Sequence, residues 1–127
     1  MSLPDATKLL DRLTMTQRPG WRPDFVEIND QYILWGTGTV SRTGMGIVGS
    51  RTTSTKVIGI RLYYDSPHSI VLSTWSGDHY LVSFRNEDNN IVTHVFRTNK
   101  LANAQNYVDA IETIVSYYRE SPEENDD

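Results

Sequence analysis

The residue types that most often bind metals or catalyse reactions are few in this chain and widely separated. The three histidines, His68, His79 and His94, belong to no His-x-x-x-His helix and have no cluster of carboxylates beside them. Cysteine is absent, which excludes thiolate catalysis, disulfides and any cysteine-ligated metal site. We therefore predict no metal site and no cofactor.

One nucleophile and base pair is conceivable, because the predicted sheet brings Ser73 near His94. No acid on that face would orient the histidine, so the pair lacks the third member of a catalytic triad. The acids of this region, Asp65, Asp78, Glu87 and Asp88, fall in predicted turns, where carboxylates are expected for turn chemistry. An enzyme with an unfamiliar active site is thus the third alternative, and we predict a protein without catalytic activity.

Residues 44–49, Gly-Met-Gly-Ile-Val-Gly, match the glycine fingerprint of dinucleotide sites. That fingerprint binds a pyrophosphate only where the glycines lead from a buried strand into a helix. The β-prone run 50–55 follows instead, so we predict two short strands bent by glycine, Thr37–Arg42 and Met45–Arg51, or a mobile loop.

The same region is basic, since residues 31–64 contain no acid. Arg42, Arg51 and Lys56 could hold an anion on this loop, Gly36–Lys56, and they are our predicted ligand-binding residues. The alternative is a solvated edge without a ligand. Nucleic acid is an unlikely partner, because the chain as a whole carries a net charge of -4.

Length and composition predict one globular domain over residues 1–120. The acidic residues Glu123, Glu124, Asp126 and Asp127 predict a disordered tail over residues 121–127. No apolar run is long enough to span a bilayer, and the first residues lack the pattern of a signal peptide. We therefore expect a soluble, cytoplasmic protein.

Two helices are expected to position these residues. Ser2 and Asp5 form a capping box before an apolar stripe, so a short helix should begin there and end before Arg18-Pro-Gly20. Residues from Lys100 to about Arg119 form a long amphipathic helix that ends before Pro122. Between the first helix and the sheet, Trp21 either covers the sheet edge or presents an aromatic ring between arginines to a partner.

A meander of four antiparallel strands is predicted between Lys56 and Thr98, after a hairpin that begins with Phe25–Ile28 and Tyr32–Trp35. The turn at residues 65–68 would pair Tyr64 with Ser69. A hairpin around Gly77-Asp78 would pair Trp75 with Tyr80, and the last hairpin would pair Val82 with His94. The predicted core face consists of Ile58, Ile60, Leu62, Tyr64, Val71, Trp75, Tyr80, Val82, Phe84, Val92 and Phe96.

The opposite face mixes aliphatic side chains with arginines, a composition typical of interfaces. Two helices cannot cover both faces of the sheet, so this face should bind a partner. On it lie Ile70, Leu72, Leu81 and Val95 beside Arg61, Arg85 and Arg97. Our predicted partner-binding residues are Trp21, Arg61, Leu72, Leu81, Arg85 and Arg97.

The predicted fold is α+β, with a twisted antiparallel meander of five to seven strands, a long C-terminal helix and a short N-terminal helix. This element order resembles the pleckstrin-homology-like superfold, which implies a partly open barrel. We expect a non-enzymatic interaction module that binds a protein or peptide partner, or another copy of itself, through the second sheet face. The alternative is a small-ligand or anion-binding domain that uses the basic loop.

Overall fold

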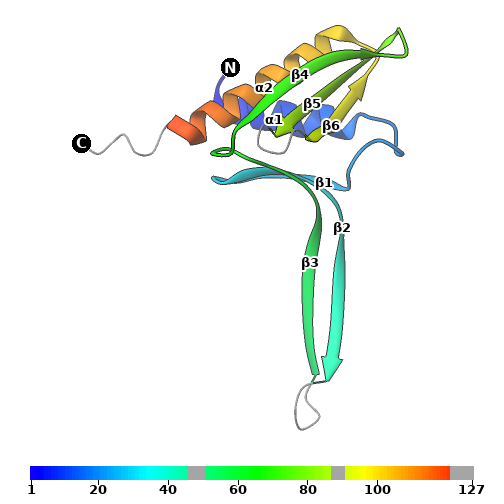
Figure 1. The fold of residues 1–127 in the computed structure, drawn as a ribbon, viewed down its shortest axis with the longest axis vertical. Coiled ribbons are helices and arrows are strands. Elements are labelled where there is room, and N and C mark those ends of the chain that lie inside the picture. The colour runs from blue at the N-terminus through cyan, green and yellow to red at the C-terminus, as the bar shows by residue number, and fades with distance from the viewer. Residues whose placement is uncertain (46–50, 87–90, 121–127) are drawn as a thin grey trace, which may run out of the picture.

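The computed structural model describes residues 1–45, 51–86 and 91–120 and shows an α+β fold (Figure 1). The helices lie at the two ends of the chain with all described strands between them. In chain order the elements are α1 (Leu3–Met15), β1 (Phe25–Ile28), β2 (Tyr32–Met45), β3 (Arg51–Tyr63), β4 (His68–Trp75), β5 (His79–Asn86), β6 (Ile91–Thr98) and α2 (Leu101–Glu120).

Local sequence signals account for the first helix and the first hairpin. The Ser2 hydroxyl accepts a hydrogen bond from the Asp5 amide at 3.2 Å, which confirms the predicted cap of α1. Between β1 and β2, the Asn29 side-chain oxygen accepts bonds from the amides of Gln31 and Tyr32, both at 2.9 Å. Asparagine commonly closes turns in this way, so the hairpin is specified by local chemistry.

The described strands form two separate antiparallel sheets, in the orders β1-β2-β3 and β4-β5-β6. The predicted continuous meander is therefore wrong at the turn of residues 65–68, where β3 and β4 do not pair. Tyr64 instead donates its amide hydrogen to Gln31, at the start of β2, and β3 pairs with β2 from Tyr63 to Arg51. A closed barrel is not seen, and the pleckstrin-homology-like resemblance is not confirmed.

Beyond Gly36, β2 and β3 continue as a two-stranded ribbon, which we call the arm (Figure 1). β1 begins opposite Gly36 and runs away from the arm, so no described third strand supports the arm. The arm leaves the sheet where two glycines face each other. A Cβ on Gly36 would lie 2.3 Å from the Phe25 ring, and one on Gly59 would lie 2.4 Å from the Trp35 carbonyl oxygen, so larger residues would push the strands apart.

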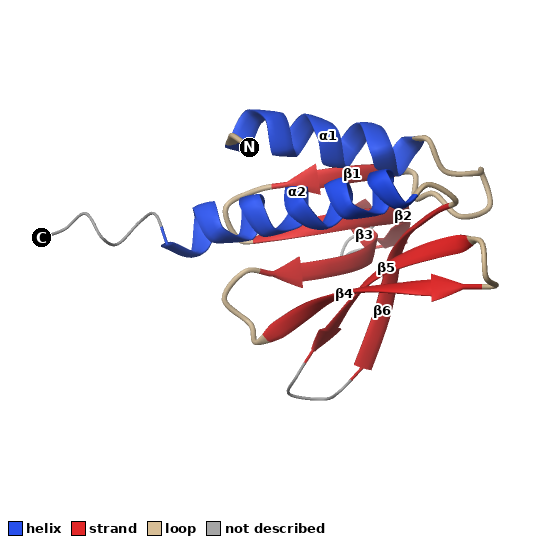
Figure 2. Ribbon diagram, turned by 90° about the horizontal axis from the view of Figure 1, so that it is seen from above, coloured by secondary structure: helices blue, strands red, loops and turns tan. Residues whose placement is uncertain are grey.

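One hydrophobic core joins both sheets to the helices, which lie side by side (Figure 2). Tyr107 of α2 is its centre and is completely buried. Its ring stacks on Phe96 of β6 with a centroid distance of 4.0 Å, and its hydroxyl accepts a bond of 2.9 Å from Trp35 Nε1 of β2. The same hydroxyl bonds to Thr14 of α1. Four elements that are distant in sequence thus meet at one side chain.

The second sheet has a different register from the predicted one. Trp75 pairs with His79 rather than Tyr80, because Ser76 and Gly77 both take left-handed conformations, with φ of 56° and 78°. The shift by one residue exchanges the two faces of β4. Val71 and Trp75 were predicted in the core, but both are 37% exposed, and Ile70 pairs with Phe84 instead.

A β-bulge changes the last hairpin as well. Val82 pairs with Phe96 and Ser83 pairs with His94, so Val95 is the extra residue between them. The bulge keeps Phe96 in the core, as predicted, but moves His94 to the face of Ser83. Burial also corrects the predicted faces, since Ile58 and Val92 are 44% and 45% exposed while Leu81 and Val95 are buried.

Candidate functional site

A serine and histidine pair exists but is not arranged for catalysis. His94 bonds through Nδ1 to the Ser83 hydroxyl at 2.7 Å, so the predicted partner Ser73 is replaced by Ser83. Ser83 is only 2% exposed, and no described carboxylate bonds to His94. The described residues also contain no group of three or more potential metal ligands.

The other two histidines have local partners beside turns. His68 Nδ1 lies 2.8 Å from the Ser66 carbonyl oxygen. His79 Nδ1 lies 3.0 Å from an oxygen of Asp78, which is largely exposed. Both histidines thus bond to residues of the adjacent turns.

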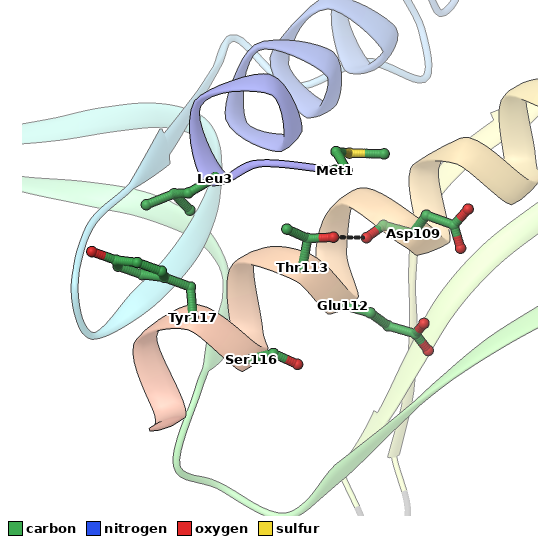
Figure 3. A pocket seen from close by; sticks show the side chains of 7 residues that line it. All are labelled: Met1, Leu3, Asp109, Glu112, Thr113, Ser116 and Tyr117. Carbon is green, nitrogen blue, oxygen red and sulfur yellow. Dashed lines mark hydrogen bonds between the residues drawn. The ribbon is translucent and has the colours of Figure 1, made fainter. Parts of the chain in front are cut away.

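One hollow, of about 670 Å³, lies between the start of α1 and the outer side of α2 (Figure 3). Its polar side chains do not converge. Thr113 donates its hydroxyl to the Asp109 carbonyl, and the carboxylates of Asp109 and Glu112 point away from that bond. The hydroxyls of Ser116 and Tyr117 also point in different directions (Figure 3), so this hollow lacks the convergent polar groups of a ligand site.

A second hollow, of about 350 Å³, lies at the far end of α2. Tyr64, in the turn that follows β3, stacks there on Tyr118 of α2, with ring centroids 5.1 Å apart. The Tyr64 hydroxyl is buried without a hydrogen-bond partner among the described residues, and burial raises its pKa far above the ordinary value. We interpret the stack as a packing contact between α2 and the turn that follows β3.

A cluster of aromatic rings and arginines lies where β4 turns into β5, and we call it the tryptophan–arginine stack. The Arg97 guanidinium lies over two indole rings, 5.0 Å from the centroid of Trp21 and 4.7 Å from that of Trp75. Arg18 lies 4.5 Å from the centroid of Trp21. The two indoles and His79 contact one another edge to face, at centroid distances of 5.4 to 6.0 Å.

Two side chains anchor the connector that follows α1. Gln17, buried at the end of α1, accepts the Arg97 amide hydrogen through Oε1 at 2.8 Å and donates from Nε2 to the Thr14 carbonyl at 3.0 Å. Arg22, which also flanks Trp21 in the sequence, donates instead to the Met15 carbonyl at 3.3 Å. The connector after α1 is thus tied to β6, and Trp21 is half-buried over the second sheet.

The stack adjoins an uncovered edge strand. In the order β4-β5-β6, β4 has no described strand on its outer side. Every residue from Val71 to Trp75 is exposed. The exposure affects both faces of β4, because some of these side chains lie on the face of Val82 and the others on the face of Leu81. Three of them, Val71, Leu72 and Trp75, are large and apolar.

The structure brings together only some of the predicted partner-binding residues. Trp21 and Arg97 meet in the stack, and Leu72 lies in β4 beside it. Leu81 is buried, Arg85 is exposed farther along β5, and Arg61 lies over Tyr32 in the other sheet, 5.2 Å from its centroid. These six residues therefore do not share one surface.

The predicted ligand-binding residues lie in the arm. Arg42 is paired with Ser54, Arg51 with Met45, and Lys56 with Val40. Their side chains lie outside the part of the structure that is described, as do the glycine fingerprint beyond Met45 and the tail 121–127.

The sequence interpretation missed Arg18, Trp75 and His79. The signal for Arg18 was present, since two arginines flank Trp21. Trp75 and His79 were missed because the stack forms only in the observed register of β4 and β5.

Comparison with protein-family models, curated proteins and solved structures finds no match for this chain. No described helix is long and apolar enough to cross a membrane.

Proposed function

We propose that this protein is a non-enzymatic interaction module and that its partner is an extended protein segment added as a strand to the outer edge of β4. The observation that carries this proposal is that β4 is an edge strand exposed on both faces, with Val71, Leu72 and Trp75 along it. An extended segment can bond to the free backbone groups of such an edge and place alternate side chains on its two faces.

The sequence of β4 lacks the features that normally keep edge strands unpaired. Native proteins protect an exposed edge with charged side chains, proline or a β-bulge. β4, His-Ser-Ile-Val-Leu-Ser-Thr-Trp, contains no lysine, arginine, acid or proline, and its register with β5 runs without a break. The opposite edge, β6, has a bulge at Val95 and carries Arg97, so it is protected where β4 is not.

Selection from a random dodecapeptide library displayed on phage would test this function. The wild-type protein should enrich a family of peptides, and a synthetic member should slow amide hydrogen exchange in β4. Leu72→Glu should remain folded and lose this binding, because a charge on the edge opposes strand addition. Val92→Glu is the matched control, because Val92 is an exposed aliphatic residue on the other edge strand.

Two results would contradict the proposal. One is a wild-type protein that enriches no peptide family, and the other is a Leu72→Glu variant that binds selected peptides as well as wild type does. If the wild-type protein instead sediments as a dimer that Leu72→Glu dissociates, a second copy of the chain occupies β4 and the module is an assembly element.

A second candidate function is anion binding by the arm, which projects from the sheet and contains Arg42, Arg51 and Lys56 but no acid. Inorganic phosphate is a suitable probe. A bound ligand at 100 times its dissociation constant should add about 2.7 kcal/mol to the free energy of unfolding. A thermal shift that persists after all three residues are replaced by glutamine would exclude the arm as the site.

A further inference from the structure

The tryptophan–arginine stack holds two cations that have no anionic partner within the described residues. Neither Arg18 nor Arg97 forms an ion pair there, and Asp78, the acid next to the stack, contacts His79 instead. A guanidinium that stacks on an indole ring keeps its N–H groups free at its edge. Arg97 is oriented by two rings and by the Gln17 contact to its backbone, so its donors are positioned before any ligand arrives.

The stack also borders a hollow of suitable chemistry. A space of about 230 Å³ is lined by Arg18, Trp21, His79, Arg97, Thr98 and Asn99, together with the end of α1. Its described lining contains two arginines, an indole, an imidazole, hydroxyls and amides, and no carboxylate. The two guanidinium groups are charged donors and no anion offsets them in this lining, so the hollow favours a negatively charged group.

The ring of Trp75 links the end of β4 to the residues that line the hollow. Trp75 is the last residue of β4, and its ring contacts Arg97, Trp21 and His79, three residues that line the hollow. We propose that the segment bound at β4 carries an aspartate or glutamate whose carboxylate enters this hollow and bonds to Arg97 and Arg18. This inference rests on the proposed strand addition and names the chemistry of the partner.

The acidic tail of the same molecule cannot be that segment. The hollow lies beside the first turn of α2, whereas the tail follows its last residue, and a helix of 20 residues is roughly 30 Å long at 1.5 Å per residue. Residues 121–127 can span at most about 25 Å when fully extended. We therefore assign the carboxylate to a separate polypeptide and not to residues 121–127.

The phage selection described above also tests this inference when its sequences are compared between variants. Peptides selected by wild-type protein should be enriched in aspartate and glutamate near one end. Peptides selected by the double variant Arg18→Gln/Arg97→Gln should lose that enrichment. Arg22→Gln is the matched control, since Arg22 lies in the same connector and contacts no aromatic ring in the described structure.

A synthetic selected peptide allows a double-mutant cycle. Changing its acid to the corresponding amide should weaken binding to wild type about tenfold, as expected for loss of a charge-assisted contact, and should not change binding to the double variant. Fluorescence of Trp21 and Trp75 would report the binding. The wild-type affinity should also fall as salt rises.

The outcomes separate the inference from the function on which it rests. Selected peptides without acid enrichment, or an acid-to-amide change that weakens binding equally for both proteins, would overturn the carboxylate assignment and leave strand addition standing. A selection that enriches no peptides would overturn both.

Discussion

Two aromatic clusters of this protein use similar residues in opposite ways. Around Tyr107 the polar atoms of the rings bond to one another or to Thr14, and the rings are buried. In the tryptophan–arginine stack the rings are partly exposed, and the cations over them have no acid among the described residues. A cluster whose polar atoms bond to one another inside the protein stabilises the fold. A cluster whose arginine N–H groups have no acceptor at the surface is available to a partner.

The largest difference between the clusters should appear in stability. Phe96→Ala removes a ring that is 2% exposed and stacked on Tyr107, so it should lower the free energy of unfolding by about 3–5 kcal/mol. Trp75→Ala removes a larger ring that is 37% exposed and should cost about 1 kcal/mol or less. Urea denaturation measures both, and equal losses would show that the stack also serves the core.

The hydrogen bonds of Tyr107 should have a smaller effect than its packing. In Tyr107→Phe, Trp35 Nε1 loses its acceptor inside the core, while Thr14 keeps its bond to the Leu10 carbonyl. Leaving one buried donor unpaired should cost about 1–3 kcal/mol. Replacing Trp35 by phenylalanine in the same variant removes that donor, so the two losses should not add. If the losses of unfolding free energy in the two single variants simply add in the double variant, the hydrogen bond between Trp35 and Tyr107 does not stabilise the fold.

Tyr107 also predicts how stability depends on alkaline pH. Burial raises the pKa of its hydroxyl far above the ordinary tyrosine value of 10.0. The unfolded chain loses this proton near pH 10 and the folded protein does not, so the contribution of Tyr107 to stability is constant below that pH and falls above it. One such group contributes a slope of up to about 1.4 kcal/mol per pH unit. The decline measured for Tyr107→Phe should be shallower than for wild type.

Local signals in the sequence were sufficient for the helices and for the first hairpin. Ser2 caps α1 and Asn29 closes the turn before β2 through side-chain contacts within a few residues, so residue type alone indicates them. Long-range pairing was not predictable in this way. Nothing in the residue types signals a left-handed Ser76 or an extra Val95, yet these two features set the faces of β4 and the position of His94.

The candidate site depended on those same features. Trp21 was recognisable as an aromatic flanked by arginines, and Arg97 as a cation on the second face of the predicted sheet. Their meeting with Trp75 requires the observed register, in which Trp75 faces away from the core. The sequence therefore indicated Trp21 and Arg97 as candidate residues, but it did not indicate that they contact Trp75.

The smallest stability effect, and the sharpest separation of stability from binding, is expected for Leu72→Glu. Leu72 is 37% exposed on β4, so the new carboxylate remains solvated and the free energy of unfolding should change by less than about 1 kcal/mol. Leu81, predicted on the same face, is 7% exposed on β5 and would bury the charge. If Leu72→Glu unfolds the protein, β4 is part of the core and cannot be a free edge. If it stays folded and loses peptide binding while Val92→Glu does not, the edge of β4 is a surface that contributes to recognition and not to folding.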